Sequence, residues 1–273
     1  MPLAVKSLAE WEADKVSGML SILIPAYNEE EVIEQTVRSL YEELLASHIL
    51  HEILIINDRS KDGTESILCR LQAEIPTLRY ANNCPPNGFG FAVRYGLSIF
   101  RGDAVCIFMA DSSDSPKDLV RFYQKMEEGY DCVFGSRFMK EGTVYDYPLL
   151  KWVFNRLGNL FIQILFLMKY NDTTNAFKIY RRHVIAGIQP ILSSHFNLTV
   201  ELPLKAIVRG YTYAVLPNSW HNRKKGVSKF KIKEMGSRYL FIIFYCFIEK
   251  LFSRGDYKSL VEQSGDKIQV WHR

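Results

Sequence analysis

The sequence contains no apolar stretch long enough for a membrane-spanning helix. Its longest apolar runs, at residues 160–168 and 239–248, fall well short of the roughly 18–20 residues that a span requires. Near the N-terminus, Glu10, Glu12 and Asp14 stand where an export signal would need an apolar core. We therefore expect a cytoplasmic protein without an export signal.

The cysteines show no pairing pattern. The five of them are odd in number, follow no metal-ligand spacing and lie mostly inside apolar runs. This pattern argues against disulfides and against cysteine-bound zinc, and it favours a reducing compartment.

The chain also has little net charge, only +4 over 273 residues. Much of it lies in residues 221–238, which carry seven basic side chains and one acidic one. A basic patch on a neutral-to-acidic body predicts an anionic partner at one place rather than nucleic acid. The alternative is that this segment is a solvated loop.

The sequence does have a regular alternation of short apolar runs and helical patterns. Strands are expected at residues 20–24, 52–57, 78–81, 103–109 and 131–136, with helices between them. This order predicts an α/β fold, a doubly wound, mostly parallel sheet with helices on both faces.

The pattern changes in the second half of the chain. We expect an aromatic-rich helix over residues 148–170, a strand at 175–180, a helix at 196–208, a strand at 211–216 and an apolar helix at about 235–252. The most apolar part of the last helix, residues 239–252, is about 21 Å long and too short to cross a hydrocarbon core of about 30 Å. Basic residues flank it, which is typical of a helix lying in the membrane interface.

The earlier aromatic helix is a candidate partner for this interface helix. Together the two would form an entry for a lipid chain, lined on the earlier helix by Trp152, Phe154, Phe161, Phe166 and Tyr170. The alternative is that both helices pack in the core or in a homodimer.

An acidic, hydroxyl-rich turn follows the apolar run at residues 105–109. Asp111, Ser112, Ser113 and Asp114 offer hard oxygen ligands of the kind that Mg²⁺ or Mn²⁺ prefers. In an α/β sheet, ligands bind beyond the carboxyl ends of the strands, where this turn is expected. The alternative is an acidic helix N-terminus after a buried strand.

Four motifs in a fixed order resemble the nucleotide-sugar domain of the inverting family 2 glycosyltransferases: SILIPAYNEE, IINDRSKDGT, FMADSSDSP and FGSRF. Three later segments resemble one branch of that family, the dolichyl- and polyprenyl-phosphate sugar synthases: DTTNAFKIYRR, VELPLKAIVRGY and NRKKGVSKF. The resemblance implies a GT-A fold with a glycosyltransferase domain at residues 19–235. This domain divides into a nucleotide-sugar half (19–137) and an acceptor half (138–235), flanked by an extension (1–18) and an apolar interface helix with a polar tail (236–273).

The resemblance also implies roles for individual residues. Pro25, Tyr27 and Glu29 would surround the nucleotide, and Asp58 would accept a hydrogen bond from its base. Asp111 matches the last Asp of the D-x-D element that holds the metal and the diphosphate. The phosphates of donor and acceptor would lie among four basic residues, Arg137, Arg156, Arg223 and Lys229.

Two positions depart from the family pattern. Asn57 replaces the first Asp of the turn after the second strand, and Met109 replaces the first Asp of D-x-D. A thioether is a poor ligand for a hard cation. The metal would therefore depend on Asp111, donor phosphates and water, with Ser113 and Asp114 as further candidates. Outside the motifs, Arg94 could reach the nucleotide from the helix after the Gly88 loop.

The chemistry favours a phosphate as acceptor. A lipid phosphate is already anionic and requires charge neutralisation and positioning, whereas a hydroxyl requires a general base. The sequence thus predicts transfer of a sugar from a nucleotide diphosphate to a polyprenyl phosphate, with inversion, by a peripheral protein on the inner face of the membrane. Two alternatives remain open: transfer to a glycan or small-molecule hydroxyl, with Asp114 or Glu201 as base, or an inactive nucleotide-sugar-binding subunit. A homo-oligomer is compatible with each.

Overall fold

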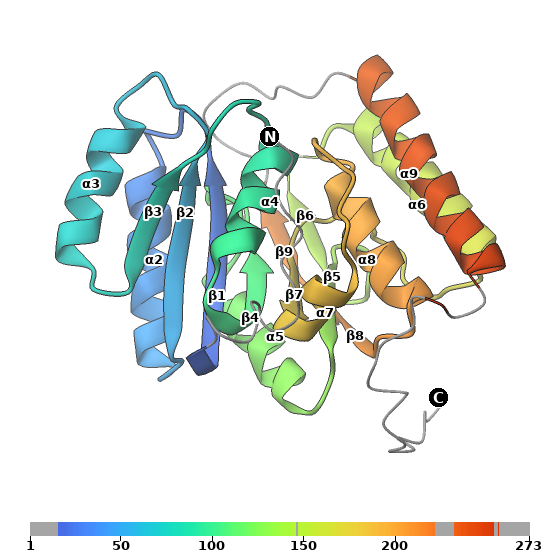
Figure 1. Ribbon diagram of the computed structural model, residues 1–273, viewed down its shortest axis with the longest axis horizontal. Coiled ribbons are helices and arrows are strands. Elements are labelled where there is room, and N and C mark those ends of the chain that lie inside the picture. The colour runs from blue at the N-terminus through green and yellow to red at the C-terminus, as the bar shows by residue number, and fades with distance from the viewer. Residues whose placement is uncertain (1–15, 146, 222–231, 254–255, 257–273) are drawn as a thin grey trace.

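A seven-stranded sheet forms the centre of the molecule. The computed structural model describes residues 16–145, 147–221, 232–253 and 256. The strand order is β3-β2-β1-β4-β7-β5-β8 (Figure 1). The strands are β1 (Val16–Ala26), β2 (His51–Asn57), β3 (Leu78–Asn82), β4 (Gly102–Ile107), β5 (Cys132–Ser136), β7 (Lys178–Arg181) and β8 (Tyr213–Pro217).

All the paired strands run parallel except β7, which is antiparallel to both β4 and β5. The predicted doubly wound, mostly parallel sheet is confirmed. The strand that departs from it could not be identified from the sequence, because strand direction leaves no signal in a short apolar run.

Helices cover both faces of the sheet. One face packs against α2 (Ile33–Ala46), α3 (Thr64–Glu74) and α5 (Pro116–Glu127). The other packs against α4 (Phe89–Ile99), α7 (Arg182–Gly187) and α8 (Leu198–Val208). Along β2, Ile53 and Ile55 belong to the first core, and Leu54 and Ile56 to the second. Burial on both faces explains why these strands read as unbroken apolar runs.

A third core lies between α8, α6 (Leu149–Phe166) and α9 (Ile232–Phe252). In Figure 1, α6 and α9 lie side by side at the end of the molecule, away from the sheet. Among the described helices, none is both long and apolar enough to cross a membrane.

The prediction that the aromatic helix continues to residue 170 was wrong. α6 ends at Phe166 because Leu167 adopts a left-handed conformation with φ of 53°. Tyr170 therefore lies outside the helix and is buried in the second core, the one beneath α4, α7 and α8. Phe166 packs against α9 instead of facing outward. Neither residue can line a surface entry for lipid, whereas Trp152, Phe154 and Phe161 are exposed.

Three short elements were not foreseen. The strands β6 (Thr143–Tyr145) and β9 (Ser219–His221) pair in parallel and form a separate two-stranded sheet. The helix α7 has only six residues. A strand of three residues is too short to show a period-2 pattern, and a helix of six residues makes fewer than two turns.

Candidate active site

The topology brings the predicted site residues to one edge of the sheet. β1, β2, β4 and β5 all end at this edge, so Pro25 lies at the carboxyl end of β1, and Asp58, Asp111 and Arg137 follow the ends of the other three. β7 runs the opposite way and begins here, which places the preceding segment, residues 172–177, at the same edge. The position matches the ligand-binding crevice expected of α/β sheets.

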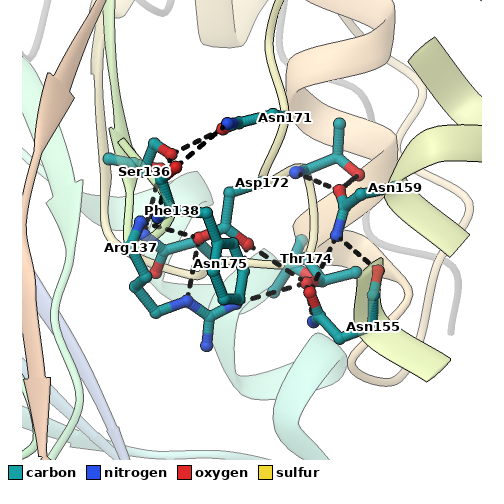
Figure 2. Close-up of polar contacts among 12 residues, drawn as sticks. Ser136, Arg137, Phe138, Asn155, Asn159, Asn171, Asp172, Thr174 and Asn175 are labelled. Carbon is teal, nitrogen blue, oxygen red and sulfur yellow. Dashed lines mark hydrogen bonds and ion pairs between the residues drawn. The ribbon is translucent and has the colours of Figure 1, made fainter. Parts of the chain in front are cut away.

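Arg137 is held by a residue that the sequence prediction did not include, Asp172. The guanidinium donates from Nε to Asp172 Oδ2 (2.8 Å) and from Nη2 to Oδ1 (2.7 Å). The backbone N–H of Arg137 donates to Oδ2 of the same carboxylate (3.0 Å). Figure 2 shows the two side chains facing each other. Burial alone would lower the pKa of Arg137, but the adjacent Asp172 carboxylate raises it above its ordinary value, so the cation persists.

The segment that carries Asp172 is fixed from both sides (Figure 2). From α6, Asn159 Oδ1 accepts hydrogen bonds from the N–H and the hydroxyl of Thr173. From the sheet side, Asn175 donates to the carbonyl of Gly135 and to Oδ1 of Asn218. A buried acidic residue in a Thr/Asn-rich turn next to an apolar strand was the available signal, but the turn precedes its strand instead of following it.

Arg156 and Arg137 both lie over the ring of Phe138. The guanidinium carbon of Arg156 is 4.6 Å from the centroid of the Phe138 ring, and that of Arg137 is 5.5 Å from the same centroid. Arg156 also donates from Nη1 to the carbonyl of Asn171 (3.2 Å). The structure thus brings together two of the four basic residues expected around the phosphates. Arg223 and Lys229 lie outside the described residues.

Two further aromatic rings lie near Arg137. Its guanidinium carbon is 5.9 Å from the ring centroid of Tyr147 and 6.0 Å from that of Trp220. The ammonium of Lys151 lies 5.2 and 5.7 Å from the same two centroids. Trp220, on β9, also pairs with Asp114 through an isolated bridge. The unforeseen β6–β9 sheet therefore connects the basic cluster to the acidic turn.

The acidic turn after β4 is folded on itself. Asp114 Oδ2 accepts the N–H of Met109 (3.0 Å), and Asp111 Oδ1 accepts the N–H of Ser113 (3.2 Å). Ser112 has a left-handed φ of 58°, and its hydroxyl lies 2.6 Å from that of Thr36. Ser113 and Asp114 are buried, while Asp111 is partly exposed. Burial raises the pKa of Asp114 to about 7, against the opposing effect of the Met109 hydrogen bond.

On the donor side of the edge, Asp58 links two loops. Its Oδ1 accepts from Asn83 Nδ2 (2.7 Å) and its Oδ2 from the N–H of Gly88 (2.7 Å). Burial raises the pKa of Asp58, although both hydrogen bonds favour its charged form. Gly88 has a φ of +139°, which L side chains rarely adopt. The loop that leads into α4 is thereby held against the end of β2.

The loop after β1 is tied to the loop after β2. The N–H of Glu29 donates to the hydroxyl of Thr64 (2.9 Å), and Asn28 Oδ1 accepts the N–H of Lys61 (2.8 Å). Tyr27, in this loop, and the preceding Pro25 are partly exposed. Arg94, the remaining predicted donor residue, lies on α4 with its guanidinium carbon 6.0 Å from the Phe91 centroid.

Glu201 takes a structural role. It forms a fully buried ion pair with Lys205 (2.7 Å) and accepts the N–H groups of Leu192 and Ser193 (2.7 Å each). The contacts lie within α8 and the loop before it. Glu201 is therefore a buried ion-pair partner, which does not suit the role of general base.

No group of three or more His, Cys, Asp or Glu side chains that could hold a metal occurs among the described residues. At the acidic turn, the carboxylate available to a cation is that of Asp111, which is partly exposed. Two residues earlier, Met109 has a thioether in place of a carboxylate. This donor set suits a cation held mainly by phosphates and water, as Mg²⁺ commonly is. It does not suit a cage built from protein ligands alone.

Comparisons with known proteins agree with this architecture. The model of the family described as "Glycosyl transferase family 2" matches residues 21–188. Polyprenol monophosphomannose synthase of Mycolicibacterium smegmatis is 28% identical over 233 residues, which cover 80% of this chain and 86% of that protein. Glycosyltransferase AglD of Haloferax volcanii is 28% identical over 205 residues, 74% of this chain but only 33% of that longer protein.

The fold is also similar to that of a solved enzyme. The crystal structure of glucosyl-3-phosphoglycerate synthase from Mycobacterium tuberculosis, in complex with Mn²⁺, UDP and phosphoglyceric acid, has a TM-score of 0.62 to this chain. The identity is 17%, over 89% of this chain and 82% of that one. At this identity the likeness concerns the fold alone.

Proposed function

We propose, given that this chain belongs to glycosyl transferase family 2, that it transfers a sugar from a nucleoside diphosphate to a polyprenyl phosphate, with inversion. The observation that carries the proposal is the basic cluster of Arg137 and Arg156 at the same sheet edge as Asp58 and Asp111. The similarity to polyprenol monophosphomannose synthase supports the choice of acceptor.

The donor would bind across the ends of β1, β2 and β4. Asp58 is already oriented by Asn83 and Gly88, and a carboxylate oxygen can accept a second hydrogen bond, here from the base. Pro25, Tyr27 and Glu29 would line the nucleotide from the loop after β1, with Arg94 approaching from α4. The diphosphate would then extend toward Asp111.

A divalent cation fits this arrangement as a companion of the diphosphate. Asp111 would be its protein ligand, with Ser113 and Asp114 as further candidates, and phosphate oxygens and water would complete the coordination. When bound, Mg²⁺ or Mn²⁺ would neutralise charge on the leaving diphosphate. The crystal structures of the fold neighbour hold Mn²⁺ in several complexes and Mg²⁺ in another.

The acceptor phosphate would meet Arg137 and Arg156. Arginine makes paired, planar contacts with phosphate, and the Asp172 pair keeps the Arg137 guanidinium in one orientation. An acceptor oxygen attacks the anomeric carbon, the bond from that carbon to the diphosphate oxygen breaks, and the nucleoside diphosphate leaves with the electron pair. A single displacement inverts the anomeric configuration. An ionised phosphate has no proton to lose, so this step requires no general base.

The apolar surface of α6 and α9 supports action at a membrane. Large apolar side chains are exposed along both helices, among them Leu150, Phe154, Leu157 and Ile164 on α6, and Phe241, Phe244, Ile248 and Phe252 on α9. So much exposed apolar surface marks an interaction site. We assign it to the lipid surface that carries the acceptor, which makes the protein a peripheral one on the cytoplasmic face.

Product analysis tests this function. The purified chain is incubated with Mn²⁺, a short polyprenyl phosphate and each of a panel of nucleotide sugars, and the products are identified by mass and by NMR of the anomeric proton. We expect one donor to give a polyprenyl-phosphate sugar with inverted configuration. A parallel set of reactions with free glycans and sugars as acceptors tests the hydroxyl-acceptor alternative. Product in that set, with none from the polyprenyl phosphate, would overturn the proposal. Nucleotide-sugar binding without any product would favour the inactive-subunit alternative.

A further inference from the structure

Lys178, the first residue of β7, is a buried cation next to the basic cluster. Only 1% of its surface is exposed. Its ammonium donates to three backbone carbonyls, those of Thr173 (3.0 Å), Asn175 and Thr199 (3.1 Å). An ammonium has three N–H donors, so each has an acceptor. The side chain does not reach the surface at which substrates would bind.

Two of the three carbonyls belong to the segment that presents Asp172. Thr173 follows Asp172 directly, and Asn175 ends the turn that leads into β7. Asp172 in turn accepts hydrogen bonds from the backbone N–H, Nε and Nη2 of Arg137. Lys178 is therefore one contact removed from the residue that orients the guanidinium.

The third carbonyl connects this segment to the helices beyond it. Thr199 lies in the first turn of α8, and its side chain hydrogen-bonds Tyr239 of α9. The Lys178 ammonium thus joins the Asp172 segment to α8 at the point where α9 packs. A hydrocarbon side chain of the same length would fill this space but would leave three buried carbonyls without a donor, which is costly.

We propose that Lys178 is a positioning residue for the sugar transfer, holding residues 172–175 in the conformation in which Asp172 orients Arg137. This rests on the proposed function, because it assumes that Arg137 binds the reacting phosphates. Lys178 would thus act on the transfer step, in which Arg137 and Arg156 must fit the transition state. Binding of the nucleotide at the ends of β1 and β2 does not depend on it.

The chain offers a matched control in Arg182. Like Lys178 it is a buried cation that serves backbone carbonyls, donating to those of Gly102 (2.8 Å) and Phe100 (2.8 Å). Gly102 begins β4, so these contacts lie at the edge of the sheet opposite the site. Arg182→Met measures the general cost of removing a buried cation from this fold.

The experiment compares Lys178→Met, Asn159→Ala and Arg182→Met with the wild-type chain. Asn159→Ala removes the hydrogen bonds that tie Thr173 to α6. It takes the place of Lys178→Met as the test variant if Lys178→Met does not fold. For Lys178→Met we expect kcat to fall about ten- to hundredfold, with donor KM and the Kd for UDP and GDP in Mn²⁺ within about twofold of wild type. We expect kcat of Arg182→Met to stay within about twofold.

Hydrogen exchange followed by mass spectrometry gives a readout independent of activity. In peptides covering Arg137 and residues 172–178, the backbone amide hydrogens should exchange at least about tenfold faster in Lys178→Met and Asn159→Ala than in the wild type. Their exchange rate should be unchanged in Arg182→Met. A kcat for Lys178→Met that falls no further than that of Arg182→Met would overturn the proposal. If the wild-type chain forms no product, the proposed function fails, and unchanged exchange in the two segment variants would separately reject the positioning role.

Discussion

Arg137 and Asp172 are 35 residues apart in the sequence and form a bidentate ion pair with N–O distances of 2.8 and 2.7 Å. The pair joins the end of β5 to the turn before β7, two strands that run in opposite directions. Both side chains are buried, so neither charge can be left alone without a large penalty. The pair therefore supplies a cation of fixed orientation at the site edge.

Asp172→Asn should destabilise the protein strongly. It leaves the Arg137 guanidinium buried without a counter-charge, which typically costs about 3–5 kcal/mol. Urea unfolding gives the free energy change. Glu127→Gln provides the control, because Glu127 pairs with Arg181 in an exposed position and should cost less than about 1 kcal/mol. An equal cost for the two variants would mean that Arg137 is not desolvated as the structure has it.

Asp111→Asn should abolish the stimulation of nucleotide-sugar binding by Mn²⁺ while leaving the fold intact. Asp111 is the surviving carboxylate of the two-Asp element, and an amide is a weaker ligand for a hard cation. Calorimetric titration with and without Mn²⁺ measures the effect. Asp103→Asn, at the opposite end of β4, is the control and should bind as wild type. Undiminished stimulation in Asp111→Asn would remove this residue from the proposed metal site.

The sequence predicted the parts of the fold that depend on local pattern. The strands that lead to Asp58, Asp111 and Arg137 were identified because each is a short apolar run followed by turn-forming or polar residues. The antiparallel β7 and the three-residue strands β6 and β9 were missed because pairing direction and very short strands depend on tertiary contacts. The family relationship and the α/β architecture are confirmed.

The partners of the site residues were harder to predict. Asp172 and Lys178 are within a motif that carried the family resemblance, yet nothing local shows that one grips Arg137 or that the other binds three carbonyls. Those contacts exist only because β7 enters the sheet between β4 and β5. Glu201 is the contrasting case, since its partner Lys205 lies one turn along α8, at a spacing visible in the sequence.

Lys178 should make stability depend on pH. Burial lowers its pKa to about 7, against 10.5 when exposed, although the nearby Asp172 carboxylate opposes the shift. Between these values the unfolded chain binds a proton that the folded chain does not retain, so this group makes stability rise with pH. Near pH 7 both forms are present, and the neutral amine that predominates at higher pH keeps two donors for the three carbonyls.

Unfolding free energies at pH 7, 8 and 9 for the wild type and Lys178→Met test this. The difference between the two should change in favour of the wild type by up to about 1.4 kcal/mol per pH unit. Subtracting the variant removes the contributions of other titrating groups. A difference that stays constant across this range would show that Lys178 keeps an ordinary pKa.

The last prediction concerns the apolar face of α6 and α9. The wild-type chain should float with vesicles containing anionic lipid, because exposed apolar side chains enter the interface while basic residues attract the headgroups. High salt should weaken the binding, and alkaline carbonate should release the protein. The double variant Phe154→Glu/Phe241→Glu should lose at least about tenfold in membrane affinity, because each charge replaces a side chain more than half exposed on this face.

Leu50→Glu is the control for this variant. Leu50 is 56% exposed, close to the 57% of Phe154. It directly precedes β2, which lies toward the end of the molecule opposite α9 (Figure 1). Leu50→Glu should float as the wild type does. If the wild-type chain stays at the bottom of the gradient even when the vesicles contain a polyprenyl phosphate, the membrane assignment fails. A dimer in light scattering that Phe154→Glu/Phe241→Glu dissociates would then assign the same face to a second copy of the chain.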